Sequence, residues 1–300
     1  SCRRMDNFVE RVPHIGIIAG TAEGAALCYR TLCQEAEGVM GRRHAHPEVT
    51  LHSFSLHQYL DAIDQDDWTE VAALMSQSAA KLRQVGADII ICPNNTLHKA
   101  FGLVESPVPW VHIARPVVRE IEANRWRRVG ILGTQTVMEG SVYSEPLRQS
   151  NIDLIVPEQN DRARIQHIIW HELIAGICTV HSALFVQQVI AEMALNGAEA
   201  VILACTELPL LMAGYQTAVP LLDSTRLLAR AALHCRVQEE RHSEGKYFVD
   251  RRVVIDAQKD TTCAGPDLIL EQRRKYYGDG CSTMKVVHRL TRTGMSCTSF

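Results

Sequence analysis

Short, continuously apolar segments alternate with amphipathic stretches of helical length along residues 14–235 of this chain. Continuous apolarity over so few residues is typical of parallel strands covered on both faces, whereas one-sided periodicity is typical of helices. The alternation predicts right-handed βαβ units and therefore an α/β fold with a mainly parallel sheet. The expected strands are 14–20, 49–54, 88–92, 110–114, 128–132, 153–156, 200–204 and 219–222, and the clearest helices are 67–85, 162–175 and 183–195.

The same pattern occurs twice. Residues 86–95 align with 197–206 at an offset of 111, and this offset also aligns 108–112 with 219–223. Gly16 and Gly130 open a further pair of similar segments at an offset of 114. The repeat predicts two similar lobes. The expected divisions are a first lobe of residues 14–112 completed by 219–235, a second lobe of 113–218, and an appended, partly disordered tail at 236–300. Within that tail we expect a strand at 247–255 and a helix at 267–277.

Composition narrows the functional classes. The 300 residues carry a net charge of −3, with 46% hydrophobic and 22% charged residues, as in a globular protein with an apolar core. Because there is no basic excess, nucleic-acid binding is not expected. No apolar run in the sequence approaches the roughly 20 residues that span a bilayer, so no membrane association is expected. The ten cysteines form no CxxC pair, and we expect reduced thiols and a cytoplasmic location.

The two copies differ where a polar turn follows a matched strand. The second copy has Cys205 at this position, and the first has Asn94. Residues 205–209 have the pattern of a helix start, and a helix N-terminus lowers the pKa of a thiol. The sequence therefore favours Cys205 as a base or nucleophile near neutral pH, with a buried structural cysteine as the alternative.

Other polar residues near these turns suggest a carboxylate site. Asn94, Asn95 and Thr96 offer amides and a hydroxyl at the start of an expected helix, where anions bind, although the same residues also suit a helix cap. Thr134 opens the corresponding turn after the strand at 128–132. His167 and His171 lie four residues apart, but because the pattern offers no third ligand, an exposed helix face is favoured over zinc. No metal or cofactor is required by any of these motifs.

At these residues the chain resembles the aspartate/glutamate racemase family, whose members racemise amino acids without pyridoxal phosphate. The family's first motif is cysteine-asparagine-threonine-x-histidine, and this chain has Asn94-Asn95-Thr96-Leu97-His98. The second motif is glycine-cysteine-threonine-glutamate, and this chain has Ala204-Cys205-Thr206-Glu207. The resemblance covers residues 14–235 and leaves the tail outside.

The resemblance implies two pseudo-symmetric Rossmann-like lobes, each with a mainly parallel sheet flanked by helices, that face each other across an active-site cleft. It also implies a homodimer, no cofactor and a small-molecule carboxylate substrate. In the family one cysteine removes the α-proton and another delivers a proton to the opposite face. Carried over, Cys205 is the second acid/base, with Thr206 and Glu207 in support. The residues implied to bind substrate are Asn95, Thr96 and Thr134, with His98 at the motif's histidine.

The departures from the family pattern keep other functions open. Asn94 replaces the first cysteine, and an amide cannot exchange a proton at a useful pKa, although a water held by Asn94 could substitute. Val137 stands where many members have a second threonine, so an acidic substrate is not assured. We expect an amino-acid racemase or epimerase that uses Cys205 and Asn94, with aspartate or glutamate as the family default. The alternatives are a one-cysteine decarboxylase or double-bond isomerase of a dicarboxylate, and a non-catalytic binding protein.

Overall fold

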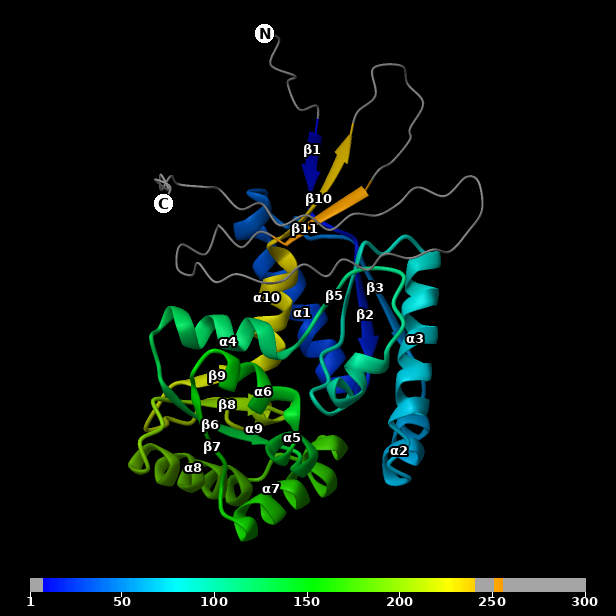
Figure 1. Cartoon of the computed structure of the whole chain (residues 1–300). Coiled ribbons are helices and arrows are strands. Elements are labelled where there is room, and N and C mark those ends of the chain that lie inside the picture. The colour runs from blue at the N-terminus through cyan, green and yellow to red at the C-terminus, as the bar shows by residue number, and fades with distance from the viewer. Residues whose placement is uncertain (1–7, 241–250, 256–300) are drawn as a thin grey trace, which may run out of the picture. The chain divides into compact units, whose positions relative to one another are not determined.

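Two parallel sheets of four strands each organise residues 13–233, which form one unit of the chain (Figure 1). The structure is a computed structural model that describes residues 8–240 and 251–255. The first sheet has the order β3-β2-β4-β5, with β2 at Ile15–Ala19, β3 at Val49–Ser53, β4 at Ile89–Ile91 and β5 at Trp110–Val111. The second has the order β7-β6-β8-β9, with β6 at Arg128–Gly133, β7 at Asp153–Ile155, β8 at Ala200–Ala204 and β9 at Leu221–Asp223. All eight strands expected from the sequence are present.

The pairing register repeats from one sheet to the other. In the first sheet β4 pairs with β5 through Ile90 and Trp110, and in the second β8 pairs with β9 through Val201 and Leu221. Each residue of the first pair lies 111 positions before its counterpart in the second. The duplication seen in the sequence is therefore also present in the backbone hydrogen bonding.

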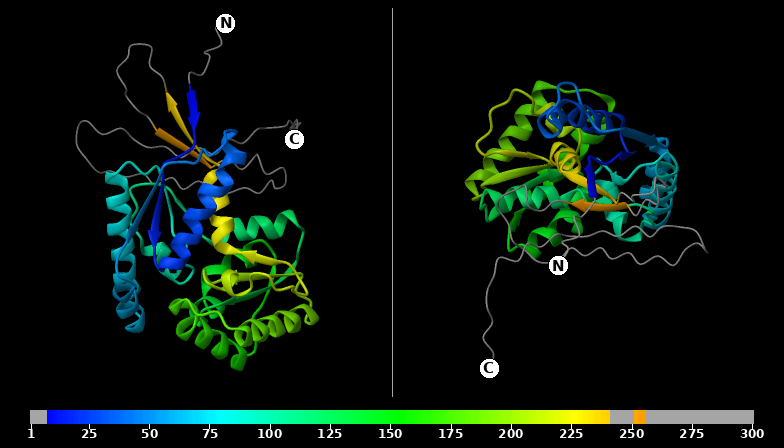
Figure 2. Two further views of the ribbon diagram at one scale, coloured as in Figure 1. Left: turned by 180° about the vertical axis from the view of Figure 1, so that it is seen from behind. Right: turned by 90° about the horizontal axis from the view of Figure 1, so that it is seen from above.

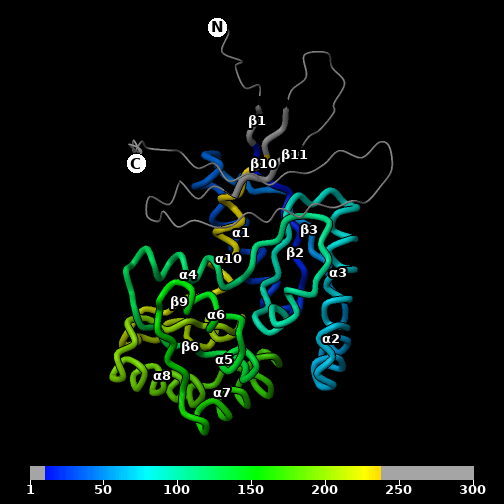
Figure 3. The backbone as a smooth tube through the Cα atoms, viewed as in Figure 1, coloured from blue at the N-terminus to red at the C-terminus, as the bar shows by residue number. Residues whose placement is uncertain are grey.

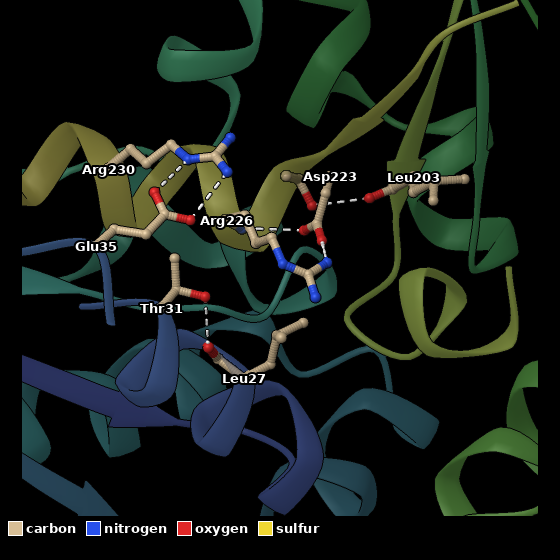
Figure 4. A network of polar contacts seen from close by, with 8 residues as sticks. Leu27, Thr31, Glu35, Leu203, Asp223, Arg226 and Arg230 are labelled. Carbon is tan, nitrogen blue, oxygen red and sulfur yellow. Dashed lines mark hydrogen bonds and ion pairs between the residues drawn. The ribbon is translucent and has the colours of Figure 1, made fainter. Parts of the chain in front are cut away.

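One expected assignment was wrong. We expected 219–235 to complete the first lobe, but its strand β9 pairs with β8 in the second sheet. The repeat explains this, because β9 is the counterpart of β5, which follows β4 in the first sheet. The helix after β9, α10 (Ser224–Leu233), does pack against the first lobe's α1 (Ala22–Met40), as Figures 1 and 2 show. Figure 4 shows the ion pair between these helices, in which Arg230 contacts Glu35 at 2.6 and 3.0 Å.

Helices flank both sheets (Figure 3), and polar side chains fix where several of them begin. Thr21 caps α1 by accepting from the N–H of Gly24, Asp67 caps α3 (Trp68–Gln84), and Thr179 caps α8 (Val180–Leu195). The other helices of the first half are α2 (Leu56–Asp64), the 3₁₀ helix η1 (Thr96–Leu103) and α4 (Ala114–Ala123). Those of the second half are α5 (Gln135–Glu139), α6 (Ser141–Gln149), α7 (Gln159–His171), η2 (Leu173–Ala175) and α9 (Leu208–Leu211). The three helices expected from periodicity correspond to α3, to α7 with η2, and to α8. Within the described residues, none of the helices has the length and apolarity needed to cross a bilayer.

Equivalent glycine and acidic residues in the two lobes precede β4 and β8. Gly86 and Gly197 follow α3 and α8 with φ of 94° and 92°, in the left-handed region that favours glycine. Two residues after each glycine, an acidic side chain accepts hydrogen bonds from backbone N–H groups where the neighbouring strand begins. Asp88 accepts from His14 at 2.8 Å, and Glu199 accepts from the segment that enters β6. These contacts align β4 with β2 and β8 with β6 before the ladders begin.

A separate antiparallel sheet lies outside residues 13–233. Its order is β1-β10-β11, with β1 at Phe8–Arg11, β10 at Cys235–Glu240 and β11 at Arg251–Ile255 (Figure 1). Of the strand expected at 247–255, the part at 251–255 is present as β11 and the rest lies outside the described residues, whereas the pattern did not predict β1 or β10. The expected helix at 267–277, and most of the tail for which partial disorder was predicted, lie outside the described residues.

Candidate active site

The candidate active site is a pocket at the carboxyl ends of β4 and β8, where α/β sheets usually bind ligands. Both lobes line it. The polar lining residues of the first lobe are Thr21, Asn94, Asn95 and Thr96, and those of the second are Thr134, Cys205, Thr206 and Glu207. Of the eight residues predicted from the motifs, seven line this pocket.

Glu207 organises the second-lobe side of the pocket. Its side chain is 3% exposed, and its Oε2 accepts from the thiol of Cys205 at 3.1 Å and from the hydroxyl of Thr206 at 2.6 Å. Its Oε1 accepts from the hydroxyl of Thr21 at 2.7 Å. A buried carboxylate needs such donors to offset its lost hydration. Because Thr21 belongs to the first lobe, Glu207 also connects the two lobes.

The thiol of Cys205 is a proton donor in this arrangement. Burial raises its pKa well above the ordinary value, and the negative charge of Glu207 raises the pKa further. We expected a helix N-terminus to lower this pKa, and that expectation was wrong. The helix that follows, α9, has four residues, and the thiol is 6% exposed, so the backbone N–H groups near it do not outweigh burial and the carboxylate.

Asn94 holds the matched position on the first-lobe side. Its Oδ1 accepts from the N–H of Leu97 at 3.1 Å, at the start of η1. Its side chain lies directly against Gly20, where an added Cβ would stand 2.3 Å from Asn94 Nδ2. Glycine at position 20 therefore makes room for Asn94. The amide can orient a ligand or a water through hydrogen bonds, but it cannot carry a proton between them.

Two hydroxyl groups meet across the lobes beside Asn94. Thr96 Oγ1 of the first lobe lies 3.0 Å from Thr134 Oγ1 of the second. Their mutual hydrogen bond uses one of the two hydroxyl hydrogens, which leaves the other able to donate to a ligand carboxylate. This geometry suits the carboxylate-binding role that the resemblance implies for these residues.

Asn95 reaches the pocket, but its side-chain amide is engaged elsewhere. The amide oxygen accepts from the hydroxyl of Tyr143 at 2.6 Å, and the amide nitrogen donates to Ser224 Oγ at 3.1 Å. Ser224 in turn donates to the carbonyl oxygen of Leu203 at 2.9 Å, in the strand that ends beside Cys205; Leu203 is among the residues drawn in Figure 4. This buried network connects the first-lobe motif to the second-lobe strand, and no motif in the sequence indicated the part that Tyr143 plays in it.

His98 lies behind the pocket rather than in its lining. Its Nδ1 contacts the carbonyl oxygen of Asn94 at 2.8 Å, and its Nε2 accepts from the N–H of Ile113 at 3.2 Å. Nδ1 therefore carries the proton and the ring is neutral. Burial lowers the pKa of His98 to about 4. Both ring nitrogens are used by the backbone, which favours a role in positioning Asn94.

The described residues contain no group of three or more histidine, cysteine or acidic side chains that could hold a metal ion. His167 and His171 lie beside each other on α7, with ring centroids 4.4 Å apart and the ring planes tilted by 37°, and both residues are exposed. The polar groups that line the pocket are a thiol, a carboxylate, amides and hydroxyls.

A two-lobed α/β protein with a thiol hydrogen-bonded to a carboxylate in the cleft has the parts of an acid/base isomerase. The family model for Asp/Glu/Hydantoin racemase matches residues 15–232. The chain therefore belongs to the Asp/Glu/hydantoin racemase family, and it is an enzyme of the racemase type.

Individual relatives agree with this assignment. The broad specificity amino-acid racemase RacX of Bacillus subtilis is 26% identical over 194 residues, which cover 63% of this chain and 81% of RacX. A solved Asp/Glu racemase-family protein from Yersinia pestis is 30% identical with a TM-score of 0.67, over 73% of this chain and 96% of that one. An aspartate racemase homologue from Pyrococcus horikoshii is 28% identical with a TM-score of 0.63, over 74% and 97%.

Proposed function

We propose that this protein racemises or epimerises an amino acid by exchanging the α-proton through Cys205, with Asn94 on the opposite side of the substrate. The observation that carries the proposal is the hydrogen bond from the Cys205 thiol to Glu207 inside a pocket lined by both lobes. It gives the thiol a place to send its proton and a route to recover it. Enzymes of this kind need that reversibility because the same group acts as base and as acid.

The substrate completes the activation in this proposal. An amino acid enters as a zwitterion, and its α-ammonium places a positive charge beside the thiol and the carboxylate. A nearby positive charge favours the thiolate over the thiol, because opposite charges lower the pKa of an acid. The thiol proton passes to Glu207, the Cys205 thiolate takes the α-proton, and the reverse steps return it. Thr96 and Thr134 hold the α-carboxylate.

The face of the substrate's α-carbon opposite Cys205 meets no comparable acid/base group. Asn94 cannot donate or accept a proton at neutral pH, so a water that it orients takes this part. Proton delivery on that face is slower than on the Cys205 face. We therefore expect one enantiomer to exchange its α-proton faster than the other.

Proton NMR in D2O with both enantiomers of an amino-acid panel tests the proposal. Wild type should replace the α-proton by deuterium, and Cys205→Ser should lower the rate by about a hundredfold or more, the usual range for losing a positioned acid/base group. Cys178→Ser is the matched control, because Cys178 is an exposed thiol away from the pocket lining. Exchange that persists at the wild-type rate in Cys205→Ser contradicts the mechanism.

One observation favours a second candidate. Because burial and Glu207 keep Cys205 protonated, the thiol suits protonation of an enolate-like intermediate on a single face. That is the chemistry of a one-cysteine decarboxylase of disubstituted malonates. Carbon dioxide release from a malonate panel, lost in Cys205→Ser, supports this reading, and stabilisation by a ligand without turnover supports a binding protein instead.

The homodimer and the cytoplasmic location that we expected remain predictions. Sedimentation equilibrium of the full chain tests the first, because a dimer of a 33.5 kDa chain has twice that mass. Fractionation of the source cells tests the second.

A further inference from the structure

One face of α2 forms an apolar wall of the pocket. Leu56, Tyr59, Leu60 and Ile63 follow the spacing i, i+3, i+4 and i+7, which places side chains on one side of a helix. All four line the pocket. Tyr59 is fully buried, and the other three are half-buried, so this face is covered in part by the protein and in part open to a ligand.

The second lobe contributes further apolar side chains to the wall of the pocket. Ile169 and Trp170 come from the last turn of α7, and Ile174 comes from η2 directly after it. In the repeat, α2 follows β3 and α7 follows β7, so the two walls come from equivalent places in the two lobes (Figure 1). A ligand side chain in this part of the pocket meets hydrocarbon and aromatic surface from both lobes.

The charge of the pocket lining also favours an apolar ligand side chain over an acidic one. Among the described residues that line the pocket, Glu207 is the one Asp, Glu, Lys, Arg or His side chain, and it is negative. Its hydrogen bonds come from a thiol and two hydroxyls, which carry no positive charge. A side-chain carboxylate, in addition to the α-carboxylate that every amino acid carries, would meet the like charge of Glu207 and an apolar wall, and both disfavour a buried anion.

We propose that the pocket selects an amino acid with an apolar side chain, of the leucine, methionine or phenylalanine type, over aspartate and glutamate. This inference rests on the proposed function. The reacting carbon lies between Cys205 and Asn94, the α-carboxylate binds Thr96 and Thr134, and the side chain lies against α2 and the α7–η2 wall. Burial of apolar surface supplies the affinity for the side chain.

The test compares α-proton exchange in D2O for leucine, methionine, phenylalanine, aspartate and glutamate, with binding of the same compounds measured in parallel by calorimetry. We expect leucine or a related amino acid to exceed aspartate and glutamate by about tenfold or more in both readouts, because one buried methylene alone contributes severalfold. Leu60→Arg places a cation in the wall, and should raise the glutamate-to-leucine ratio by about tenfold or more. Leu195→Arg, an identical change at an 87% exposed position on α8, should leave the ratio unchanged.

The outcomes separate this inference from the proposed function. Exchange of aspartate or glutamate at a rate equal to that of leucine overturns the inference and leaves the racemase proposal standing. Binding of leucine without exchange of any amino acid supports the inference and contradicts the racemase proposal. Failure of every apolar amino acid to bind or exchange, or an unchanged ratio in Leu60→Arg, overturns the inference.

Discussion

Removing the hydroxyl of Tyr143 tests whether the buried network beside the pocket holds the two lobes together. Tyr143 is fully buried, and Asn95, whose amide oxygen it contacts at 2.6 Å, is 2% exposed. Tyr143→Phe keeps the ring and leaves that oxygen without this donor in a site with little access to water. An unsatisfied buried polar group costs about 1–3 kcal/mol. For a unit of this size, each kcal/mol lowers Tm by about 2–4 °C, so we expect a fall of about 2–12 °C.

Thermal and urea unfolding followed by circular dichroism measure this change. Tyr29→Phe is the control, because Tyr29 is 44% exposed and its replacement should alter the free energy of unfolding by less than about 0.5 kcal/mol. A double-mutant cycle with Asn95→Ala then isolates the pair, and residues in direct contact should couple by about 0.5–3 kcal/mol. An unchanged Tm in Tyr143→Phe, or strictly additive effects, refutes the view that this hydrogen bond stabilises the fold.

Two further predictions concern the site and its histidine. Asn94→Cys restores a thiol on the first-lobe face and should bring the two enantiomers' exchange rates within about threefold of each other. Asn94→Ser, the control, should not. If the ratio of the two exchange rates is the same in both variants, the role of Asn94 is contradicted. Burial lowers the pKa of His98 to about 4, from 6.5 when unfolded, so between these values the unfolded chain binds a proton that the folded chain does not. The free energy of unfolding should therefore fall by about 2 kcal/mol from this residue between pH 7 and pH 5, and urea titrations of wild type and His98→Gln measure that part as their difference.

The sequence was sufficient for the eight parallel strands, because parallel strands covered on both faces leave a strong apolar signal, but it was not sufficient for β1 and β10. The repeat also predicted which residues of the two sheets are equivalent, and the pairing register in the structure follows that equivalence. The one error in topology, the assignment of residues 219–235 to the first lobe, arose because the repeat was not applied to this segment. Residues 219–222 align with 108–111, and their pairing with β8 follows from the pairing of β5 with β4.

The site was predictable only as far as its residues lie in motifs. Asn94, Thr96, Cys205 and Glu207 follow strand ends, where topology brings them together. Tyr143 lies in the first turn of α6 and resembles any buried aromatic residue, so its contact with Asn95 depends on how the lobes pack. The pKa of the thiol was misjudged for a similar reason, because burial is a tertiary property that local sequence does not encode.

The duplication places Thr96 and Glu207 at equivalent positions, and each forms a hydrogen bond to a threonine of the other lobe, Thr134 and Thr21 respectively. The two contacts are alike in geometry and different in chemistry. In the second copy the group beside the matched position is a carboxylate that accepts the thiol's hydrogen bond, and in the first copy it is a hydroxyl beside an amide. Both the proton-carrying group and its acceptor are therefore on the Cys205 side. A protein built in this way can hold a substrate symmetrically between its lobes and still treat the two faces of the α-carbon differently, which is why the ratio of the two enantiomers' exchange rates is the most direct measure of how this active site works.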